Sequence, residues 1–419
     1  MGFQQGLSGL NAASKNLEVI GNNVANANTV GFKQSQAQFA DVFASSMNGS
    51  GASQVGIGTQ VAAVAQQYTQ GNVSSSNNPL DMAINGAGFF RMSNNGEVTY
   101  TRNGQFHLDK GGYIVNSSGL RLTGYGADAN GVIATGALVD VKIDTADKPP
   151  KTTANVGLLL NLDSRKVAHD LTTTPFNAAD PATYDHTTTT GIFDSLGNPH
   201  TLQTFYVKTA PLPSASGPGA WEVFASVDGV SVTTPAASSG TLTFSTNGSL
   251  DSTVASAPPF TLPLTFTTGA TTPFSIDLGF QGTTQFGSNF GVNAMTQDGY
   301  APGRLSGFSA GADGTISGRY TNGQTATLGQ IALGNFANPN GLESLGSNQW
   351  AETATSGLAL IGTAGSGRFG VMQSSATEDS NVDLTAELVN MITAQRLYQA
   401  NAQTIKTQDQ VLQTLVNLR

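Results

Sequence analysis

The chain ends with a seven-residue rhythm in the stretch DLTAELVNMITAQRLYQANAQTIKTQDQVLQTLVNL, residues 383–418. Its apolar and aromatic residues recur at alternating steps of four and three, interrupted by Gln395 and Asp409. The members of this seam are Leu384, Leu388, Met391, Tyr398, Ala402, Ile405, Leu412 and Val416. Such spacing predicts a long helix that packs against another helix.

A second seam with the same period opens the chain. Its apolar members are Phe3, Leu7, Leu10, Leu17 and Val24, with Ser14 and Gly21 in the intervening places. Because the two seams lie at opposite ends of 419 residues, the simplest fold pairs the terminal helices as a coiled coil and loops out the middle. The outer positions of the last helix are mostly Gln, Asn and Thr, which favours contact with neighbouring copies or with a water-filled lumen. We expect these ends to order on assembly.

Composition limits the function. Charged residues make up 11% of the chain, against about 25% in an average protein. The net charge is −9 and no basic run occurs, so the sequence predicts no nucleic-acid groove. Absence of cysteine excludes disulfides and thiolate chemistry. The start of the chain has no secretory signal pattern, and no apolar run approaches the roughly 18 residues that would predict membrane insertion.

The middle of the chain has the texture of short strands and turns. Asn95-Gly96 and Asn103-Gly104, between alternating apolar runs, predict two hairpins. The segments GYGADANGVI, 124–133, and GFSAGADGTI, 307–316, resemble each other and predict two further hairpin tips. Either the similarity arises by chance or one β-domain has two halves that flank an inserted domain.

We therefore expect a mainly β chain with long terminal α-helices. The expected helical domain comprises residues 1–24 and 383–419, and a linker follows at 25–71. A discontinuous β-domain comprises 72–145 and 284–382, and an outer β-domain is inserted at 146–283. The first helix is expected to end near Val24, because the crowded residues Asn22, Asn23, Asn26 and Asn28 favour turns.

Signals for catalysis are weak. Residues 307–311 read G-F-S-A-G, but no βαβ texture surrounds this match to a nucleophile elbow. The segment 86–88 lacks the third glycine of a nucleotide-binding loop. Asp128, Asn130 and Asp313 lack the spacing of a calcium loop. The scattered histidines, with no metal-ligand spacing, are His107, His169, His186 and His200. We expect no enzyme activity, no metal and no cofactor.

Two terminal motifs resemble those of the bacterial flagellar axial proteins. They are NNVANANTVGFK, 22–33, and SNVDLTAELVNMITAQRLYQANAQTIKTQDQVLQTLVNLR, 380–419. Three internal stretches resemble the hook protein family within that class: LDMAINGAGFFRM, 80–92, FDSLGNPHTL, 193–202, and GRYTNGQTATLGQIAL, 318–333. The first motif adds Thr29, Gly31, Phe32 and Lys33 to the candidate interface, together with its four asparagines.

The resemblance implies a subunit that polymerises into a curved, hollow tube, the flexible joint between flagellar rod and filament. It implies contacts with further copies, with the distal rod, the hook cap and the hook–filament junction proteins. It also implies export through the flagellar apparatus without a cleaved signal and an extracellular location. The alternatives are a distal rod protein, against which the long central insertion argues, and a secreted carbohydrate-active β-protein whose paired carboxylates would be invisible in sequence.

Overall fold

The computed structural model describes residues 2–42, 56–94, 96–128, 131–209, 220–232, 238–251, 258–266, 269–271 and 274–417. Asn95 and Asn130, noted above as turn residues, lie outside these ranges, as do Leu418 and Arg419. The chain divides into two compact units. Unit 1 comprises Met1–Thr145, Ser306–Arg319 and Thr325–Arg419, and unit 2 comprises Ala146–Leu305 and Tyr320–Gln324.

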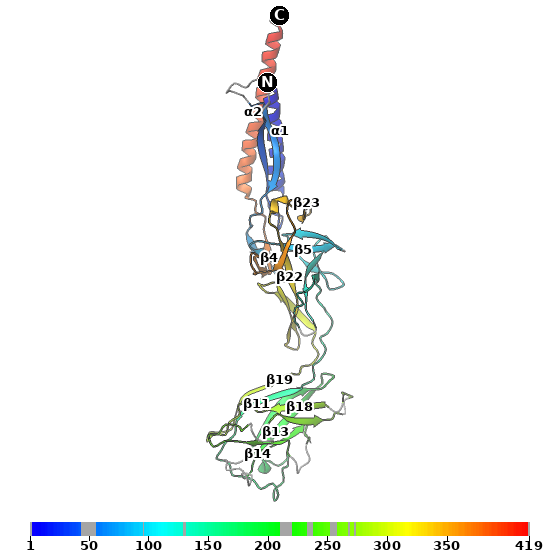
Figure 1. Ribbon diagram of the computed structural model, residues 1–419, viewed down its shortest axis with the longest axis vertical. Helices are drawn as coiled ribbons and strands as arrows, with labels where there is room; N and C mark the ends of the chain where they lie inside the picture. The colour runs from blue at the N-terminus through cyan, green and yellow to red at the C-terminus, as the bar shows by residue number, and fades with distance from the viewer. Residues whose placement is uncertain are drawn as a thin grey trace. The chain divides into compact units, whose positions relative to one another are not determined.

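Both terminal helices are present, as the seven-residue rhythm predicts. Helix α1 spans Gly2–Ala25 and helix α2 spans Leu384–Asn417, and the two lie side by side (Figure 1). The N-cap of α2 is Asp383, whose Oδ1 accepts hydrogen bonds from the backbone N–H groups of Thr385 and Ala386 at 2.9 and 3.1 Å. Neither helix is apolar over a length sufficient to cross a membrane, among the residues described.

A β-hairpin lies within the 25–71 segment that follows α1. Strand β1 (Ser35–Val42) pairs antiparallel with β2 (Gly58–Gln66), and both strands contact α1. The 25–71 segment has too few apolar residues for a core of its own, which is why the sequence indicated only a linker. The hairpin instead uses the side of α1 as its partner, so α1 contacts both the hairpin and α2.

The body of unit 1 is built around a twelve-stranded sheet, with two short strand pairs beside it. Its main path runs through β20 (Leu305–Ala310), β21 (Thr315–Tyr320), β22 (Thr325–Asn335), β9 (Arg121–Gly126), β5 (Phe89–Asn94), β6 (Glu97–Thr101), β24 (Gln349–Ala351) and β23 (Glu343–Gly346). Its short side strands are β7 (His107–Leu108), β8 (Ile114–Val115), β10 (Val139–Asp140) and β25 (Leu360–Thr363). The separate pairs are β4 (Met82–Asn85) with β26 (Val371–Ser374), and β3 (Val73–Ser75) with β27 (Ala376–Glu378). A single-turn 3₁₀ helix occupies Pro339–Gly341.

Three of the four predicted hairpins are confirmed. Strands β5 and β6, on either side of the predicted turn, pair antiparallel from Asn94 with Glu97 onward. The 124–133 tip closes through a bridge between Ala127 and Ile133, and β20 and β21 are adjacent strands joined through residues 311–314. β9 and β21, which carry the two similar tips, lie on either side of β22.

The hairpin predicted at Asn103-Gly104 is wrong. This pair follows β6 in an extended connection, where Gly104 O accepts a hydrogen bond from Met82 N–H at 2.9 Å. A Cβ at Gly104 would lie 1.6 Å from Met82 O. The glycine is therefore needed for close approach of two backbones, and not for a turn.

Unit 2 is a sandwich of two sheets. One sheet has the order β17 (Phe260–Leu264), β18 (Phe274–Gly279), β11 (Asn155–Asn161) and β19 (Gly291–Gln297). The other contains β12 (His186–Phe193), β13 (Pro199–Thr209), β14 (Ala220–Val227), β15 (Val230–Ser231) and β16 (Gly240–Thr243), and a 3₁₀ turn occupies Pro181–Thr183. Inward-facing Leu158, Leu278, Tyr206 and Trp221 share one core between the sheets.

The chain enters and leaves unit 2 through two paired segments. Lys148 and Gly303 exchange both backbone hydrogen bonds, at 2.7 and 3.1 Å, and Lys151 and Tyr300 do the same at 3.0 and 2.9 Å. The ammonium of Lys148 lies 5.1 Å from the ring centroid of Tyr300 and 5.3 Å from that of Tyr320. The segment that leads into the sandwich and the segment that leads out of it are thus hydrogen-bonded to each other at the edge of unit 2.

Asp298 links the return segment to the start of β11 and has a lowered pKa. Burial opposes its ionisation, but hydrogen bonds from the backbone N–H groups of Asn155 and Ala154 and from the side chains of Asn155 and Lys151 lower the pKa of Asp298 to about 2. Because an unfolded aspartate has a pKa of about 3.9, this stabilisation is complete above that value and is lost as the pH falls through the folded pKa.

We expect Asp298→Asn to lower the melting temperature of unit 2 at neutral pH and to flatten its dependence on pH between about 4 and 2. Thermal unfolding followed by the fluorescence of buried Trp221, in a Trp350→Phe background, measures both effects. Parallel pH curves for the variant and the parent would show that Asp298 does not supply this acid sensitivity.

Candidate assembly interface

The two terminal helices pack antiparallel through small residues of α1. A Cβ at Gly6 would lie 3.0 Å from Ile405 Cγ1, and a Cβ at Gly9 would lie 2.8 Å from the Asn401 side chain. Further along α1, Ala13 and Ile20 are also buried. These positions keep the three-four spacing, so the helices meet along a seam in which glycine permits close approach.

The helix pair predicted from sequence is correct. Most of its closely packed positions lie one residue before the apolar seam, whereas the seam residue Ile405 does contact α1, at Gly6. On α2 the buried positions are Glu387 and Ala394, and not Leu388 or Gln395. The seam residues with exposed side chains are Phe3, Leu7, Leu384, Leu388, Tyr398, Leu412 and Val416. Those that are partly buried are Leu10, Leu17, Val24, Met391, Ala402 and Ile405. The two helices approach most closely where α1 has small residues. Much of the apolar seam therefore lies at the edge of the contact between α1 and α2 or on the exposed side of the helices.

We expect Gly9→Leu to lower the free energy of unfolding of the helix pair by about 1–3 kcal/mol, because the larger side chain must displace Asn401. Gly21→Ala is the matched control. A Cβ at Gly21 meets nothing within 4 Å, so this change should raise helix stability by about 0.5–1 kcal/mol. Far-UV circular dichroism during chemical denaturation measures both. Equal effects of the two substitutions would contradict close packing at Gly9.

The asparagine-rich motif turns the chain from α1 into the hairpin. Asn23 is buried and clamps Ser35, accepting its N–H at 2.9 Å and donating to its carbonyl at 2.7 Å. Asn26 donates to Asn22 O at 3.0 Å and accepts from Thr29 Oγ1 at 3.1 Å. The motif therefore stabilises a turn within the subunit.

Other residues of the motif differ in exposure. Asn28 is exposed, Phe32 is partly buried, and Gly31 and Lys33 are buried. Gly31 has a φ of +71°, and a Cβ there would lie 2.6 Å from Asn103 N. Asn28 thus remains available to a neighbouring molecule, whereas Gly31 and Lys33 act inside the subunit.

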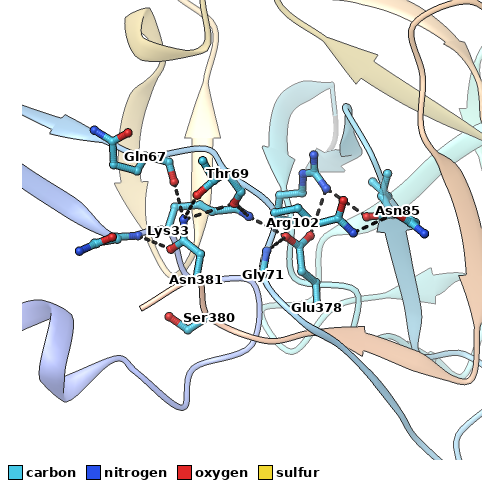
Figure 2. Close-up of polar contacts among 12 residues, drawn as sticks. Lys33, Gln67, Thr69, Gly71, Asn85, Arg102, Glu378, Ser380 and Asn381 are labelled. Carbon is cyan, nitrogen blue, oxygen red and sulfur yellow. Dashed lines mark hydrogen bonds and ion pairs between the residues drawn. The ribbon is translucent and has the colours of Figure 1, made fainter. Parts of the chain in front are cut away.

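A buried group of three charges lies where the N-terminal and C-terminal segments meet. The Lys33 ammonium is 2.6 Å from Glu378 Oε1, and the Arg102 guanidinium is 3.0 Å from Glu378 Oε2 (Figure 2). The side chains of Lys33 and Glu378 are completely buried, and that of Arg102 is 5% exposed. Burial opposes the charged forms and lowers the pKa of both Lys33 and Arg102, while the neighbouring Glu378 carboxylate partly offsets this shift.

Backbone groups also bind these charged side chains, although Arg102 Nε is buried without a hydrogen-bond partner among the described residues. Lys33 Nζ donates to Thr69 O at 2.7 Å, and Gly71 N–H donates to Glu378 Oε1 at 2.9 Å. Arg102 donates to Gly86 O at 2.7 Å and to Ile84 O at 3.3 Å. The buried ion group therefore joins the segment after α1, the segment after β2, strand β4 and strand β27.

Asn381 forms a second clamp just before α2. Its Oδ1 accepts from Gln34 N–H at 2.7 Å, and its Nδ2 donates to Gln67 O at 2.7 Å and to Thr69 Oγ1 at 2.9 Å (Figure 2). The side chain thus holds both strands of the hairpin against the start of the C-terminal helix. Together with the buried ion group, it fixes where both helices leave the β-body.

Sequence reasoning selected Lys33 but missed Arg102, Glu378 and Asn381. Charged residues are scarce in this chain. Glu378 in the short β27 and Arg102 directly after β6 therefore stand out, and their presence beside strands could have indicated a buried ion pair. No group of three metal-ligating His, Cys, Asp or Glu residues occurs in the described ranges. Lys33, Arg102, Glu378 and Asn381 therefore serve to hold the N-terminal and C-terminal segments of unit 1 together.

Family models of flagellar structural proteins match this chain of paired terminal helices and a discontinuous β-body. They match as flagella basal body rod protein, residues 3–33, flagellar hook protein FlgE/F/G D1 domain, 83–156, flagellar basal body protein FlaE D2 domain, 161–300, and flagellar basal body rod FlgEFG protein C-terminal, 373–418.

Curated relatives specify the family. The chain is 45% identical to the flagellar hook protein FlgE of Escherichia coli K12 over the full length of both, and 44% identical to that of Salmonella typhimurium LT2, also over both full lengths. It is 34% identical to the hook protein of Borreliella burgdorferi, covering 99% of this chain and 98% of that one. The chain belongs to the flagellar hook protein family, a structural and non-enzymatic family whose members polymerise as part of the flagellum.

A solved structure shares the fold. The Helicobacter pylori flagellar hook protein FlgE2 aligns with a TM-score of 0.56 at 15% identity, covering 73% of this chain and all of that one. At this identity the likeness concerns the fold alone.

Proposed function

We propose that this chain polymerises into a curved, hollow tube that serves as the flexible joint between flagellar rod and filament and as a channel for exported subunits. The observation that carries the proposal is the apolar surface left on the paired helices. Phe3, Leu7, Leu384, Leu388 and Leu412 are each between 44% and 52% exposed. An apolar surface of this kind is unfavourable in water unless another molecule covers it, and the helices of further copies would do so.

The proposed interface contains the two helical seams and the connecting motif. Its members are Phe3, Leu7, Leu10, Leu17, Asn22, Asn23, Val24, Asn26, Asn28, Thr29, Gly31, Phe32, Lys33, Leu384, Leu388, Met391, Tyr398, Ile405, Leu412 and Val416. Exposed members contact neighbouring copies, and buried members fix the geometry of the exposed ones. Residues 1–24 and 383–419 would form the inner layer, with the 25–71 segment around it. The β-domain of 72–145 and 284–382 and the inserted domain of 146–283 would then form the outer layers.

Bending requires tight contacts inside and exchangeable contacts outside. The outer domain is rich in Thr and Ser and poor in charge, so its contacts can be exchanged for water at little net cost. At its two ends the tube would contact the distal rod and the hook–filament junction proteins, and a hook cap during growth. The flagellar export apparatus would deliver each subunit to the outside of the cell without cleaving a signal.

Electron microscopy of the purified full-length chain under polymerising salt tests the proposal, beside a variant lacking residues 380–419. We expect curved hollow tubes from the full-length chain and discrete particles from the truncated one, because removal of α2 deletes half of the helical layer. Tubes from the truncated chain would refute the helical-core model, and only discrete particles from both would count against self-assembly.

A further inference from the structure

A groove of about 400 Å³ lies between α1, α2 and the beginning of β1. Ile20 of α1 is among its lining residues, together with Phe39 of β1 and with Asn390, Leu397 and Glu387 of α2. Phe39 is 41% exposed and Leu397 is 54% exposed, although both line the groove. Most of the lining residues are polar, with Ile20, Phe39 and Leu397 among the apolar ones and Glu387 as the acidic one.

Glu387 is incompletely satisfied in the single subunit. Glu387 is only 3% exposed, and its Oε1 accepts a hydrogen bond from Gln34 Nε2 at 2.5 Å. Oε2 is also buried but accepts no hydrogen bond within the described part of the chain. A buried carboxylate oxygen without a donor is unfavourable, so Oε2 would be stabilised by a hydrogen-bond donor from a second molecule.

The same helix carries a suitable cation on its opposite side. Arg396 follows Glu387 by nine residues, which at about 100° per residue places it half a turn around α2. It is exposed, and no ion pair involves it among the described residues. Val389 and Ile392, which are 58% and 51% exposed, lie on the same side of the helix. We call Val389, Ile392 and Arg396 the outer stripe of α2.

We propose that the groove of one copy receives the outer stripe of α2 from a second copy, with the Arg396 guanidinium donating to Glu387 Oε2. The proposal rests on the proposed polymerisation and names the residues of one of its contacts. A planar guanidinium presents several N–H groups to a carboxylate, and Val389 and Ile392 would pack against Phe39 and Leu397, the exposed apolar residues of the groove. Because the donor and the acceptor lie on opposite sides of α2, the contact is heterologous, and each copy can bind one copy through its groove and another through its outer stripe.

The absence of cysteine allows a direct test that does not need tubes. One full-length variant carries Asn390→Cys in the groove, and a second, of different tagged mass, carries Ile392→Cys in the outer stripe. Equal amounts are mixed and oxidised, and mass spectrometry counts the mixed disulfide dimers. We expect at least about tenfold more mixed dimer than when the second variant carries Val167→Cys, an exposed position of unit 2.

Charge variants then test the ion pair. Arg396→Gln in the second copy should lower the mixed-dimer yield about tenfold, which corresponds to about 1.4 kcal/mol, whereas Lys406→Gln should leave it unchanged. Since Arg396 is exposed, its replacement leaves the subunit folded. Glu387→Arg in the first copy combined with Arg396→Glu in the second should restore the yield.

Several outcomes would overturn the contact: mixed dimer no more abundant than with Val167→Cys, or equal effects of Arg396→Gln and Lys406→Gln. Tubes without the cross-link would leave polymerisation standing and refute this contact. The cross-link without tubes would support the contact and count against the proposed function.

Discussion

Glu378→Gln should lower the free energy of unfolding of unit 1 by about 3–5 kcal/mol. The substitution leaves Lys33 and Arg102 buried beside a neutral amide, and a buried charge without a counter-ion is far less stable than the intact group. The exposed pair Lys15–Glu18 provides the control, with both side chains at least 50% exposed. Glu18→Gln should change stability by less than about 1 kcal/mol.

The two tryptophans allow this loss to be assigned to one unit. Trp350 is buried in unit 1 and Trp221 is buried in unit 2. In a Trp221→Phe background, fluorescence during urea unfolding reports unit 1 alone. A change below 1 kcal/mol for Glu378→Gln would show that the buried ion group is not needed for stability. Replacing all three charges by apolar residues should recover part of the loss, because no charge is then left buried.

Leu388→Asp should abolish assembly while leaving the melting of the subunit nearly unchanged. Leu388 is 45% exposed in the single chain, so a carboxylate there remains hydrated until a neighbouring copy covers it. Covering the charge without a partner should raise the critical concentration for polymerisation by at least about 100-fold, or about 2.7 kcal/mol. Sedimentation of polymer over a range of concentrations measures this change.

Two companion variants separate assembly from folding. Ile405→Asp should also impair the helix pair, because Ile405 faces Gly6 of α1. Val167→Asp, at a position 82% exposed in unit 2, should affect neither folding nor assembly. Polymerisation of Leu388→Asp at the parental critical concentration would place Leu388 outside the interface.

The regular parts of the fold could be predicted from local sequence. The seven-residue rhythm gave both helices, and Asn-Gly at 95–96 gave a hairpin, because each depends on neighbouring residues. Most of the contact seam was misplaced by one residue because apolar periodicity gives no weight to Gly6 and Gly9, which allow the closest approach. The role of Gly104 was predicted wrongly for a related reason. A glycine is required there because the backbone of Met82 lies too close for a Cβ, and not because residue 104 is in a turn.

The buried ion group could not be derived in the same way. Lys33 and Glu378 are 345 positions apart, and Arg102 and Glu378 are 276 apart. The local sequence pattern does not show which distant charged residues form ion pairs, because many ion pairs are compatible with the same set of strands. The pairing of the terminal helices and the resemblance of both terminal motifs to one family indicated that the two ends meet, but neither identified the charged residues involved.

The paired segments at the entrance of unit 2 have a mechanical consequence. A domain attached by one covalent strand can swivel about its single bonds and transmits no torque. Here the outgoing and returning strands are cross-linked by backbone hydrogen bonds at Lys148 with Gly303 and at Lys151 with Tyr300. Rotating either of these two strands about its backbone bonds must therefore strain the hydrogen bonds to the other strand, so the paired segments resist twisting more than a single strand would.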